Sequence, residues 1–287
     1  MIINGPGSAF ELFFDEENSS DQQRGLPEAI TAVYGGDWVL PDTRDGIYCY
    51  SNFVMSHDGR ASFSVAGHEG GADVSAFNPH DQWLMGLLRA RADAVIVGAN
   101  TLRTESEHEW TSQFICPSDA EGFAQLRRLE GRQDAPVQVF VTRSGDITKS
   151  ATVFHQKDLT SVIVTTVSGA ERVASLGLRS VEVIVAGSHD VDLNHAIAEL
   201  RRRFGVSSVL CEGGPRVYGA FVGAQLIDEE FLTLSPVLIG ADENNRRPGL
   251  IEGLALLPAS AHRARLLSVR RAGDHLFMRT AFAYTQV

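Results

Sequence analysis

Residues 94–101 read AVIVGANT, and residues 208–215 read SVLCEGGP. Each stretch is a short apolar run that ends in glycine, which is typical of a buried strand followed by a tight turn. Because helical patterns separate the strands of this chain, their connections are crossovers and the strands lie parallel in one sheet. We therefore expect an α/β fold whose glycine-bearing turns gather at the carboxyl ends of the strands, where such sheets bind ligands.

The remaining periodic segments supply the rest of that sheet and the helices on both of its faces. Two late strands are joined by the turn residues 272–274, which predicts a hairpin and an antiparallel C-terminal edge. Residues 47–287 are expected to form this domain, and residues 1–46 an N-terminal arm, partly irregular, that packs on it. The arm contains an acidic run at 15–21 and a predicted short helix at 27–34. Further strands are predicted at 47–55, 137–142, 161–166, 181–185, 230–235, 263–270 and 275–283, and helices at 79–91 (with Asn78 as N-cap), 121–132, 193–204 and 215–223.

Composition narrows the class of protein. The chain has 287 residues, of which 44% are hydrophobic, and a formal net charge of −11. This composition is ordinary for a globular protein, and a net negative surface disfavours binding to nucleic acid. No apolar run approaches the roughly 20 residues of a membrane span, and the first residues lack a signal-peptide pattern. The cysteines Cys49, Cys116 and Cys211 are widely spaced, which argues against a disulfide framework and favours a cytoplasmic protein.

Three predicted strand ends carry groups that suit a phosphate-bearing cofactor. Glycine lets the backbone approach a ligand, and free N–H groups at a helix start bind phosphate oxygens. An arginine beside a strand end can pair with the 2′-phosphate of NADP. An ordinary turn is the alternative for each segment taken alone, and the chain has no G-x-G-x-x-G fingerprint. The candidate cofactor-binding residues are Gly98, Asn100, Thr101, Thr142, Arg143, Gly213 and Gly214.

Other polar residues in or beside these strands are candidates for contact with a substrate. Asn52 interrupts an apolar strand, where its amide needs a hydrogen-bond partner. Glu212 follows a buried strand, where a carboxylate is costly without a partner, so a functional role and a structural ion pair are both open. Asp58 either shapes a turn with Gly59 or donates a proton. The histidines form no zinc-hydrolase or zinc-deaminase motif, so no metal site is predicted. There is also no G-x-S-x-G elbow, which argues against a serine hydrolase.

Taken together and in this order, the segments resemble the pyrimidine reductase family of riboflavin biosynthesis. This family is the reductase domain of the bifunctional deaminase–reductase and has the dihydrofolate-reductase-like fold. The resemblance extends from Ile47 to the C-terminus. It is carried by residues 52–59 (NFVMSHDG), 87–103 (LLRARADAVIVGANTLR), 142–146 (TRSGD) and 209–240, which begin with VLCEGGP.

The resemblance implies a function and a set of site residues. It implies NADPH as the hydride donor, held by the three strand ends, and a small-molecule substrate held by Asn52, Ser56 and Glu212. Asp58 or Glu212 would supply the proton. The implied reaction is that of 5-amino-6-(5-phosphoribosylamino)uracil reductase, in which hydride reaches the ribosyl C1′. The resemblance also implies a homodimer, although an ordinary sheet edge covered by the arm would suit the late strands equally well.

The sequence also departs from the family pattern. Residues 1–46 are too short for a deaminase domain and lack its zinc motif, so a stand-alone reductase is expected. Where the family usually has an acidic pair, a proline and an arginine that help hold the substrate phosphate, residues 104–110 read TESEHEW. Three glutamates are electrostatically unfavourable at a phosphate site. The alternatives are therefore a pterin or dihydrofolate-type reductase on the same fold, and a protein that binds NADP(H) without catalysis.

Overall fold

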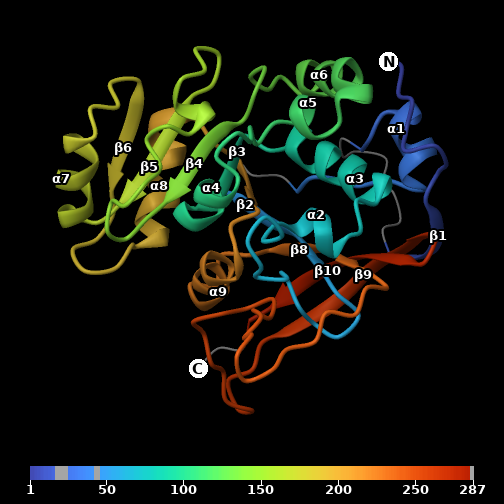
Figure 1. Ribbon diagram of the computed structural model, residues 1–287. Helices are drawn as coiled ribbons and strands as arrows, with labels where there is room; N and C mark the ends of the chain where they lie inside the picture. The colour runs from blue at the N-terminus through green and yellow to red at the C-terminus, as the bar shows by residue number, and fades with distance from the viewer. Residues whose placement is uncertain (17–24, 42–45, 285–287) are drawn as a thin grey trace.

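A computed structural model describes residues 1–16, 25–41 and 46–284 of the protein. All three of these ranges contribute strands or covering helices to one ten-stranded sheet (Figure 1). The strand order is β1-β9-β10-β8-β2-β7-β3-β4-β5-β6. Most of the acidic run expected at 15–21 lies outside the described residues. The strands are β1 (Glu11–Asp15), β2 (Tyr48–Met55), β3 (Ala94–Gly98), β4 (Val137–Val141), β5 (Ser161–Thr165), β6 (Val181–Val185), β7 (Ser208–Cys211), β8 (Glu229–Leu234), β9 (Arg263–Ala272) and β10 (His275–Ala283).

The sheet has a parallel part and an antiparallel part. From β6 to β8 all neighbouring strands run parallel, as expected when helices connect them. The hairpin of β9 and β10 then adds to β8 in antiparallel fashion, with Gly273 at a φ of 56° in its turn. The predicted α/β class and the mostly parallel sheet are confirmed. The prediction that the last strands of the chain, β9 and β10, are antiparallel is confirmed as well.

Helices cover both faces of the sheet because the side chains of each buried strand alternate between two apolar cores. Val95 and Val97 of β3 join one core, and Ala94 and Ile96 join the other. The first core lies under α1, α3, α6 and α7, and the second lies under α8 and α9. The α-helices are α1 (Glu28–Tyr34), α2 (Gly71–Val74), α3 (Pro79–Ala90), α4 (Ala99–Thr104), α5 (Ser112–Ile115), α6 (Ala120–Leu129), α7 (Val167–Ser175), α8 (Leu193–Phe204) and α9 (Pro215–Gly223), with short 3-10 turns at Pro117–Asp119 and Thr152–Phe154.

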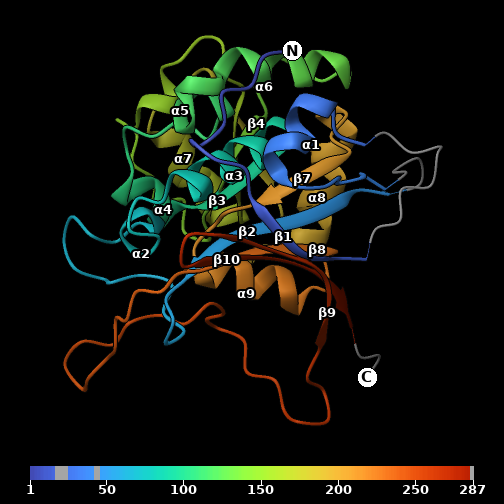
Figure 2. The ribbon, with the colours of Figure 1, turned by 90° about the vertical axis from the view of Figure 1, so that its right-hand side faces the viewer.

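The N-terminal segment is built into this core. Strand β1 pairs with β9 at the outer edge of the sheet, which no sequence pattern predicted. Phe10 and Trp38 are buried, and Trp38 packs edge-on against Tyr50 of β2. The buried guanidinium of Arg270 on β9 donates to the Tyr34 carbonyl oxygen at 2.8 Å. These contacts explain why Figure 2 shows the first residues running over α3 and along the sheet.

The carboxyl ends of the parallel strands all lie along one side of the sheet, which we call the C-terminal edge. This name refers to the ends of the strands and not to the C-terminus of the chain. Across its middle the order is β4-β3-β7-β2-β8, so the turns that follow these five strands are neighbours. Asn78 caps α3, as predicted, by accepting from the His80 amide at 2.8 Å. This cap fixes where α3 starts above the C-terminal edge. Within the described ranges, no helix is both long and apolar enough to cross a membrane.

Candidate active site

The glycines predicted at the C-terminal edge lie together in the structure. A Cβ added to Gly98 would come within 3.0 Å of Val217 on α9, and one added to Gly213 within 2.8 Å of the same side chain. Both glycines therefore let α9 approach the ends of β3 and β7. Gly214 has more room, because its added Cβ would lie 3.4 Å from the Thr101 hydroxyl on α4. The structure thus brings these four predicted residues into one place.

The first turns of α4 and α9 leave amide groups free at this place. Gly98 and Gly214, the N-cap residues of these helices, have no side chain to cap the N–H groups that follow. Because Pro215 has no N–H, the free amides of α9 begin at Arg216. Free amides and the positive end of the α9 dipole favour a negatively charged group at this point. The local geometry therefore suits the phosphates of a cofactor.

The remaining cofactor-binding candidates border the same turns. Gly98 lies opposite Val141 in the β3–β4 register, so Thr142 follows at the next position of the edge. The Thr142 hydroxyl contacts the Asp146 carbonyl at 3.4 Å. Arg143 keeps 72% of its side chain exposed, and within the described ranges its guanidinium pairs with the exposed Asp190 carboxylate, at 3.4 Å. Asn100 is exposed and accepts from Arg103. Because such surface pairs are weak, the Arg143 guanidinium is available to a ligand.

Glu212 lies one position beyond β7 on the α3 face of the sheet, where Arg89 binds it. The guanidinium donates through Nε to both carboxylate oxygens, at 3.0 and 3.1 Å, and through Nη2 to Oε2 at 2.7 Å. The Arg89 side chain is 2% exposed and that of Glu212 is 7% exposed. Arg89 was not among the predicted site residues. Helical spacing puts Arg89 opposite the apolar residues Trp83, Leu84, Leu87 and Leu88, so the periodicity of this helix gave no signal that Arg89 is buried.

Asn52 is the neighbour of Glu212 on the adjoining strand. Ser51 and Cys211 are partners in the β2–β7 register, so Asn52 and Glu212 are the next pair along the two strands. Asn52 is 6% exposed, and no side-chain hydrogen bond joins its amide to another described residue. An amide that is almost buried without a partner leaves its donor and acceptor available to a ligand.

Two more titratable groups complete what we call the Glu212 cluster, which consists of Glu212, Arg89, His108 and Glu105. Arg89 Nη1 donates to His108 Nε2 at 3.0 Å. Burial and the Arg89 charge lower the pKa of His108 to about 2, so its ring is neutral. Because Nε2 accepts from Arg89, the ring proton lies on Nδ1, which is 3.7 Å from Glu105 Oε2. Burial and the Glu212 charge raise the pKa of Glu105, against the effect of Arg89.

Asp58 and Ser56 lie apart from the Glu212 cluster, in the turn that follows β2. Ser56 lies four residues, or roughly 13 Å of extended chain, beyond Asn52. Its hydroxyl donates to Asp58 Oδ1 at 2.7 Å, and the Asp58 carboxylate also accepts from the Ile239 and Gly240 amides, at 2.9 and 2.6 Å. The Ile239 amide and the Ser56 hydroxyl lower the pKa of Asp58 to about 2, so this group is ionised at neutral pH. Asp58 thus fastens the turn to the loop after β8.

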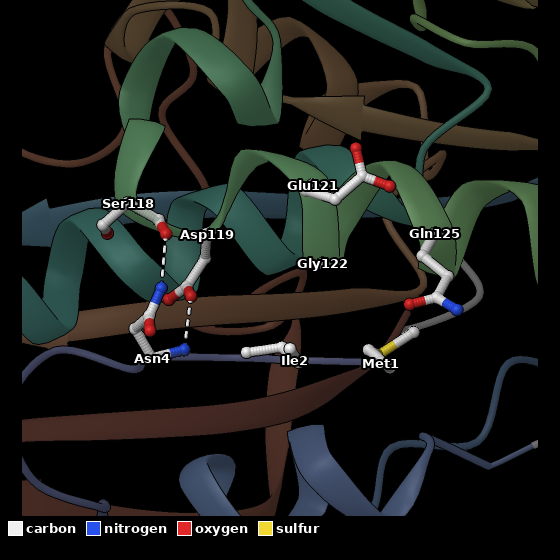
Figure 3. Close-up of a pocket in the computed structure, with 8 residues that line it drawn as sticks. All are labelled: Met1, Ile2, Asn4, Ser118, Asp119, Glu121, Gly122 and Gln125. Carbon is white, nitrogen blue, oxygen red and sulfur yellow. Dashed lines mark hydrogen bonds between the residues drawn. The ribbon is translucent and has the colours of Figure 1, made fainter.

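A separate pocket lies between the N-terminal segment and α6 (Figure 3). It has a volume of about 440 Å³ and is lined by residues that include Ile2, Asn4 and Gln125. Asp119 anchors it by accepting from the Asn4 and Gly5 amides and from the Trp83 indole N–H. The pocket contains none of the predicted site residues. Among the described residues, no three His, Cys, Asp or Glu side chains are grouped as a metal site.

The sequence comparisons point to one family. A family model described as the RibD C-terminal domain matches residues 48–276. A 2,5-diamino-6-ribosylamino-4(3H)-pyrimidinone 5′-phosphate reductase from Aquifex aeolicus is 30% identical over 156 residues, which are 54% of this chain and 62% of that protein. The reductase of the same name from Archaeoglobus fulgidus is 24% identical over 227 residues, which are 79% of this chain and 94% of that protein.

Solved structures show the same fold. A pyrimidine reductase-like protein from Corynebacterium diphtheriae superposes with a TM-score of 0.67 at 23% identity, over 89% of this chain and 98% of that one. RibD from Acinetobacter baumannii superposes with a TM-score of 0.60 at 21% identity, over 83% of this chain and 58% of that one. The predicted dihydrofolate-reductase-like fold is thereby confirmed.

Proposed function

We propose, because this chain belongs to the RibD C-terminal domain family, that it is a reductase of riboflavin biosynthesis that uses NADPH and acts on a ribosylaminopyrimidine 5′-phosphate. One observation carries the proposal. The starts of α4 and α9, which carry no side-chain cap, lie at the C-terminal edge. Glu212, which is paired with Arg89, and the unpartnered amide of Asn52 lie at neighbouring positions of the same edge. A cofactor and a substrate that bind at these positions would be neighbours, which hydride transfer requires.

The residues at the β3 and β7 ends fit a dinucleotide cofactor. The amides in the first turn of α4 and those of α9 from Arg216 onward would bind its phosphates, and the Thr101 hydroxyl lies beside Gly214. The exposed guanidinium of Arg143 would bind the 2′-phosphate that distinguishes NADPH from NADH. A reduced nicotinamide, when bound, supplies the hydride that the imine carbon at the sugar C1′ accepts.

The chain's own groups would orient the substrate and provide the proton that the imine nitrogen takes up. Asn52 can donate to and accept from the pyrimidine through its unpartnered amide. Arg89 holds Glu212 in one orientation, so this carboxylate is fixed before the substrate arrives. Glu105, whose pKa burial raises, holds a proton at higher pH than an ordinary glutamate and keeps 32% of its side chain exposed. We assign proton supply to the Glu212 cluster, since Asp58 is ionised and engaged in its turn.

Two alternatives make different use of the same site. A pterin or dihydrofolate-type reductase would turn over dihydrofolate and not the pyrimidine. A protein that binds NADP(H) without catalysis would turn over neither. The Glu212 cluster favours an enzyme, because a purely structural ion pair needs no second carboxylate with a raised pKa beside it.

Turnover assays with purified protein test the proposal. NADPH oxidation is followed with 2,5-diamino-6-ribosylamino-4(3H)-pyrimidinone 5′-phosphate, with its deaminated uracil counterpart, and with dihydrofolate. Turnover of either pyrimidine supports the proposal, and turnover of dihydrofolate alone replaces it with the first alternative. Thermal stabilisation by NADPH without turnover of any substrate would favour the second alternative.

A variant of Gly214 tests the cofactor site separately. Gly214→Val would place its side chain beside Thr101 and the free amides, and we expect it to weaken NADPH binding. Gly213→Val is the less specific choice, since its Cβ already conflicts with Val217 and the Val97 backbone. Unchanged NADPH affinity in a folded Gly214→Val variant would remove this binding site from the proposal.

The proposal extends to a cytoplasmic homodimer. The described cysteines are all free and buried, which fits a reducing compartment. Strand β1 is the outer strand of the sheet and exposes Leu12, Phe13 and Phe14 by 44%, 52% and 41%. An exposed apolar edge strand is a favourable surface for pairing with a second copy. Sedimentation of the protein and of a Phe13→Glu variant tests this, with a dimer expected only for the unchanged chain.

A further inference from the structure

Residues 104–110 (TESEHEW), where the sequence departs from the family pattern, are held in place on both sides of His108. Helix α4 ends at Thr104, and the His108 amide then donates to the Glu105 carbonyl oxygen at 3.0 Å, which closes a turn. Gln138 is a fully buried residue of β4, and its side-chain amide accepts from the Trp110 N–H at 2.9 Å and donates to the Trp110 carbonyl oxygen at 3.2 Å. These contacts fix the place of His108 in the site.

The imidazole of His108 lies between two apolar rings and a cation. Its centroid is 4.9 Å from that of the Trp110 ring and 4.5 Å from that of the Phe114 ring. On another side its Nε2 accepts from Arg89 Nη1 at 3.0 Å. Burial and the adjacent positive charge both disfavour an imidazolium, so the ring is a neutral acceptor. His108 therefore adds no charge to the site and acts through its shape and its hydrogen bonds.

The guanidinium of Arg89 directs its donors to two sides. Nε and Nη2 donate to the Glu212 carboxylate. Nη1 donates to the His108 ring and, at 3.3 Å, to the Thr111 carbonyl oxygen. Because the guanidinium is planar, acceptors that fix Nη1 also fix the direction in which Nε and Nη2 meet Glu212. His108 thus helps to orient Arg89 toward Glu212.

The same ring lies between Arg89 and Glu105. Nε2 faces Arg89, and Nδ1 faces Glu105, whose Oε2 is 3.7 Å away. A guanidinium in direct contact with a carboxylate lowers its pKa by about 1–3 units. With the ring in place, Arg89 acts on Glu105 only through its charge at a distance, and burial together with the Glu212 charge keeps the pKa of Glu105 raised.

The other neighbours of Glu105 also favour its protonated form. The charges that act on it are those of Arg89 on α3 and Glu212 at the end of β7. Gly70, on the loop after β2, brings only backbone to within reach, since an added Cβ there would lie 3.2 Å from Glu105 Oε1. Asp81 of α3 lies close enough to Glu212 for that carboxylate to raise its pKa beyond the effect of burial. Glu105 keeps 32% of its side chain exposed, so solvent can return a proton to it.

We propose that His108 is a positioning residue, which holds the Arg89 guanidinium on Glu212 and away from Glu105 so that Glu105 holds the proton of the cluster. The inference rests on the proposed function, in which the Glu212 cluster supplies the proton that the imine nitrogen takes up. His108 itself neither gives nor takes that proton.

The pH dependence of turnover tests this role. His108→Ala opens the space between Arg89 and Glu105, so the alkaline limb of the kcat profile should move to lower pH by about 1–3 units. His108→Gln keeps an acceptor for Arg89 and a donor for Glu105, and it should restore most of the profile. His80→Ala is the matched control, because it removes another buried histidine, which contacts Ser8. An unshifted limb in His108→Ala, or an equal shift in His80→Ala, overturns the proposal.

A second substitution separates the two parts of the role and serves if His108→Ala fails to fold. His108→Phe keeps a ring between Arg89 and Glu105 and keeps the packing on Trp110 and Phe114, but it offers Arg89 no acceptor. The alkaline limb should stay in place, while kcat falls about tenfold at every pH, given the usual strength of a hydrogen bond to a charged group. An unchanged kcat would show that His108 does not orient Arg89.

Carbon-13 NMR of protein labelled at the glutamate carboxyl carbons follows Glu105 without turnover, and Glu105→Gln identifies its signal. The signal should titrate above the ordinary 4.5 in the unchanged protein and about 1–3 units lower in His108→Ala. If the protein reduces no pyrimidine and the titration still moves in this way, the proposed function fails and the separation of Arg89 from Glu105 by His108 stands. If Glu105 titrates alike in both proteins, the inference is wrong whatever the protein reduces.

Discussion

Two groups of buried arginines and carboxylates lie at opposite ends of β3 and β7, and they differ in how completely their charges are paired. At the N-terminal end is the Asp93 cluster, which consists of Asp93, Arg132, Glu130 and Arg91. Asp93 accepts from Arg132 at 2.5 Å and from the amides and hydroxyls of Ser207 and Ser208. Arg91 and Arg132 share Glu130, each at 2.8 Å. Two arginines are thus ion-paired with two carboxylates in this cluster.

The Glu212 cluster at the C-terminal end is less balanced. Arg89 binds Glu212 directly and acts on Glu105 only through its charge, and the His108 ring in this cluster is neutral. Burial opposes ionisation in both clusters, yet the pKa of Asp93 is lowered because Arg132 and Ser207 outweigh burial, whereas the pKa of Glu105 is raised. The difference separates a cluster that stabilises the fold from one that has capacity left for a proton and a ligand.

The largest expected effect is on stability, from the balanced cluster. Asp93→Ala leaves Arg91 and Arg132 with Glu130 as their one shared carboxylate and removes the acceptor of four groups on Ser207 and Ser208, so the free energy of unfolding should fall by about 3–5 kcal/mol. Urea denaturation measures this loss. Arg128→Ala is the control, because it breaks the exposed pair with Glu121 and should cost less than about 1 kcal/mol. Equal losses in the two variants would contradict the role assigned to the Asp93 cluster.

The Glu212 cluster should show the reverse balance between stability and activity. Glu212→Gln keeps an acceptor for Arg89, which also donates toward the Glu109 and Thr111 carbonyl oxygens, so the fold should be less affected than by Asp93→Ala. Loss of the carboxylate should lower kcat by about 10²–10⁴-fold. Steady-state turnover and urea denaturation of the same preparation measure both effects. A variant that turns over at the full rate would remove Glu212 from the reaction.

Arg143 tests the cofactor side of the edge with a smaller effect. Arg143→Ala should weaken NADPH binding roughly tenfold, given the usual strength of a charged hydrogen bond, and leave NADH binding nearly unchanged. Arg172→Ala provides the control, since this nearby arginine is also exposed and pairs with Asp146. Titration with both cofactors measures the preference. The same loss for NADPH and NADH would show that Arg143 does not read the 2′-phosphate.

The smallest expected effect is on the pH dependence of stability, which should differ between the two clusters. Because the pKa of folded Asp93 is below its ordinary 3.8, its stabilisation is present above that pH and is lost as acid protonates it. Glu105 has the opposite sign. Its folded pKa is above the ordinary 4.5, so the folded chain binds the proton more tightly and stability falls as pH rises through that pKa.

Glu105→Gln isolates the second of these terms. The variant should lose the fall in stability above pH 4.5 and retain the fall in acid that Asp93 produces. Unfolding midpoints between pH 3 and 8 measure both limbs. A variant whose profile parallels that of the unchanged protein would show that Glu105 has no perturbed pKa.

Local patterns predicted most of the regular structure. The strands at 181–185 and 275–283 and the helix at 193–204 have the expected bounds, because each shows a clear period and is bounded by turn residues or a cap. Strand β1 and helices α2, α5 and α7 were missed. The apolar residues of β1 are exposed rather than alternating, so this strand depends on its pairing with β9 instead of on a pattern of its own.

The site was predicted in part for a related reason. Gly98, Gly213 and Thr101 could be found because a parallel sheet necessarily gathers the turns after its strands, and the structure confirms that they lie together. The roles given to Asn52, Ser56, Asp58 and Glu212 stay predictions. Sequence reasoning did not reach Arg89 or His108, whose importance comes from the groups that they contact across 123 and 19 positions of chain.

The sequence by itself determined the order of strands and helices, the parallel sheet and the edge at which its glycine turns meet. These properties follow from periodicity, chirality and turn chemistry, which act over a few residues or over single crossovers. Only the tertiary structure decided which charges are paired. An ionisable side chain responds to every charge and hydrogen-bond donor within several ångströms, and these come from segments far apart in the chain. Asp93 and Glu105 are both carboxylates beside arginines, and packing alone makes one a structural anchor and the other a holder of a proton.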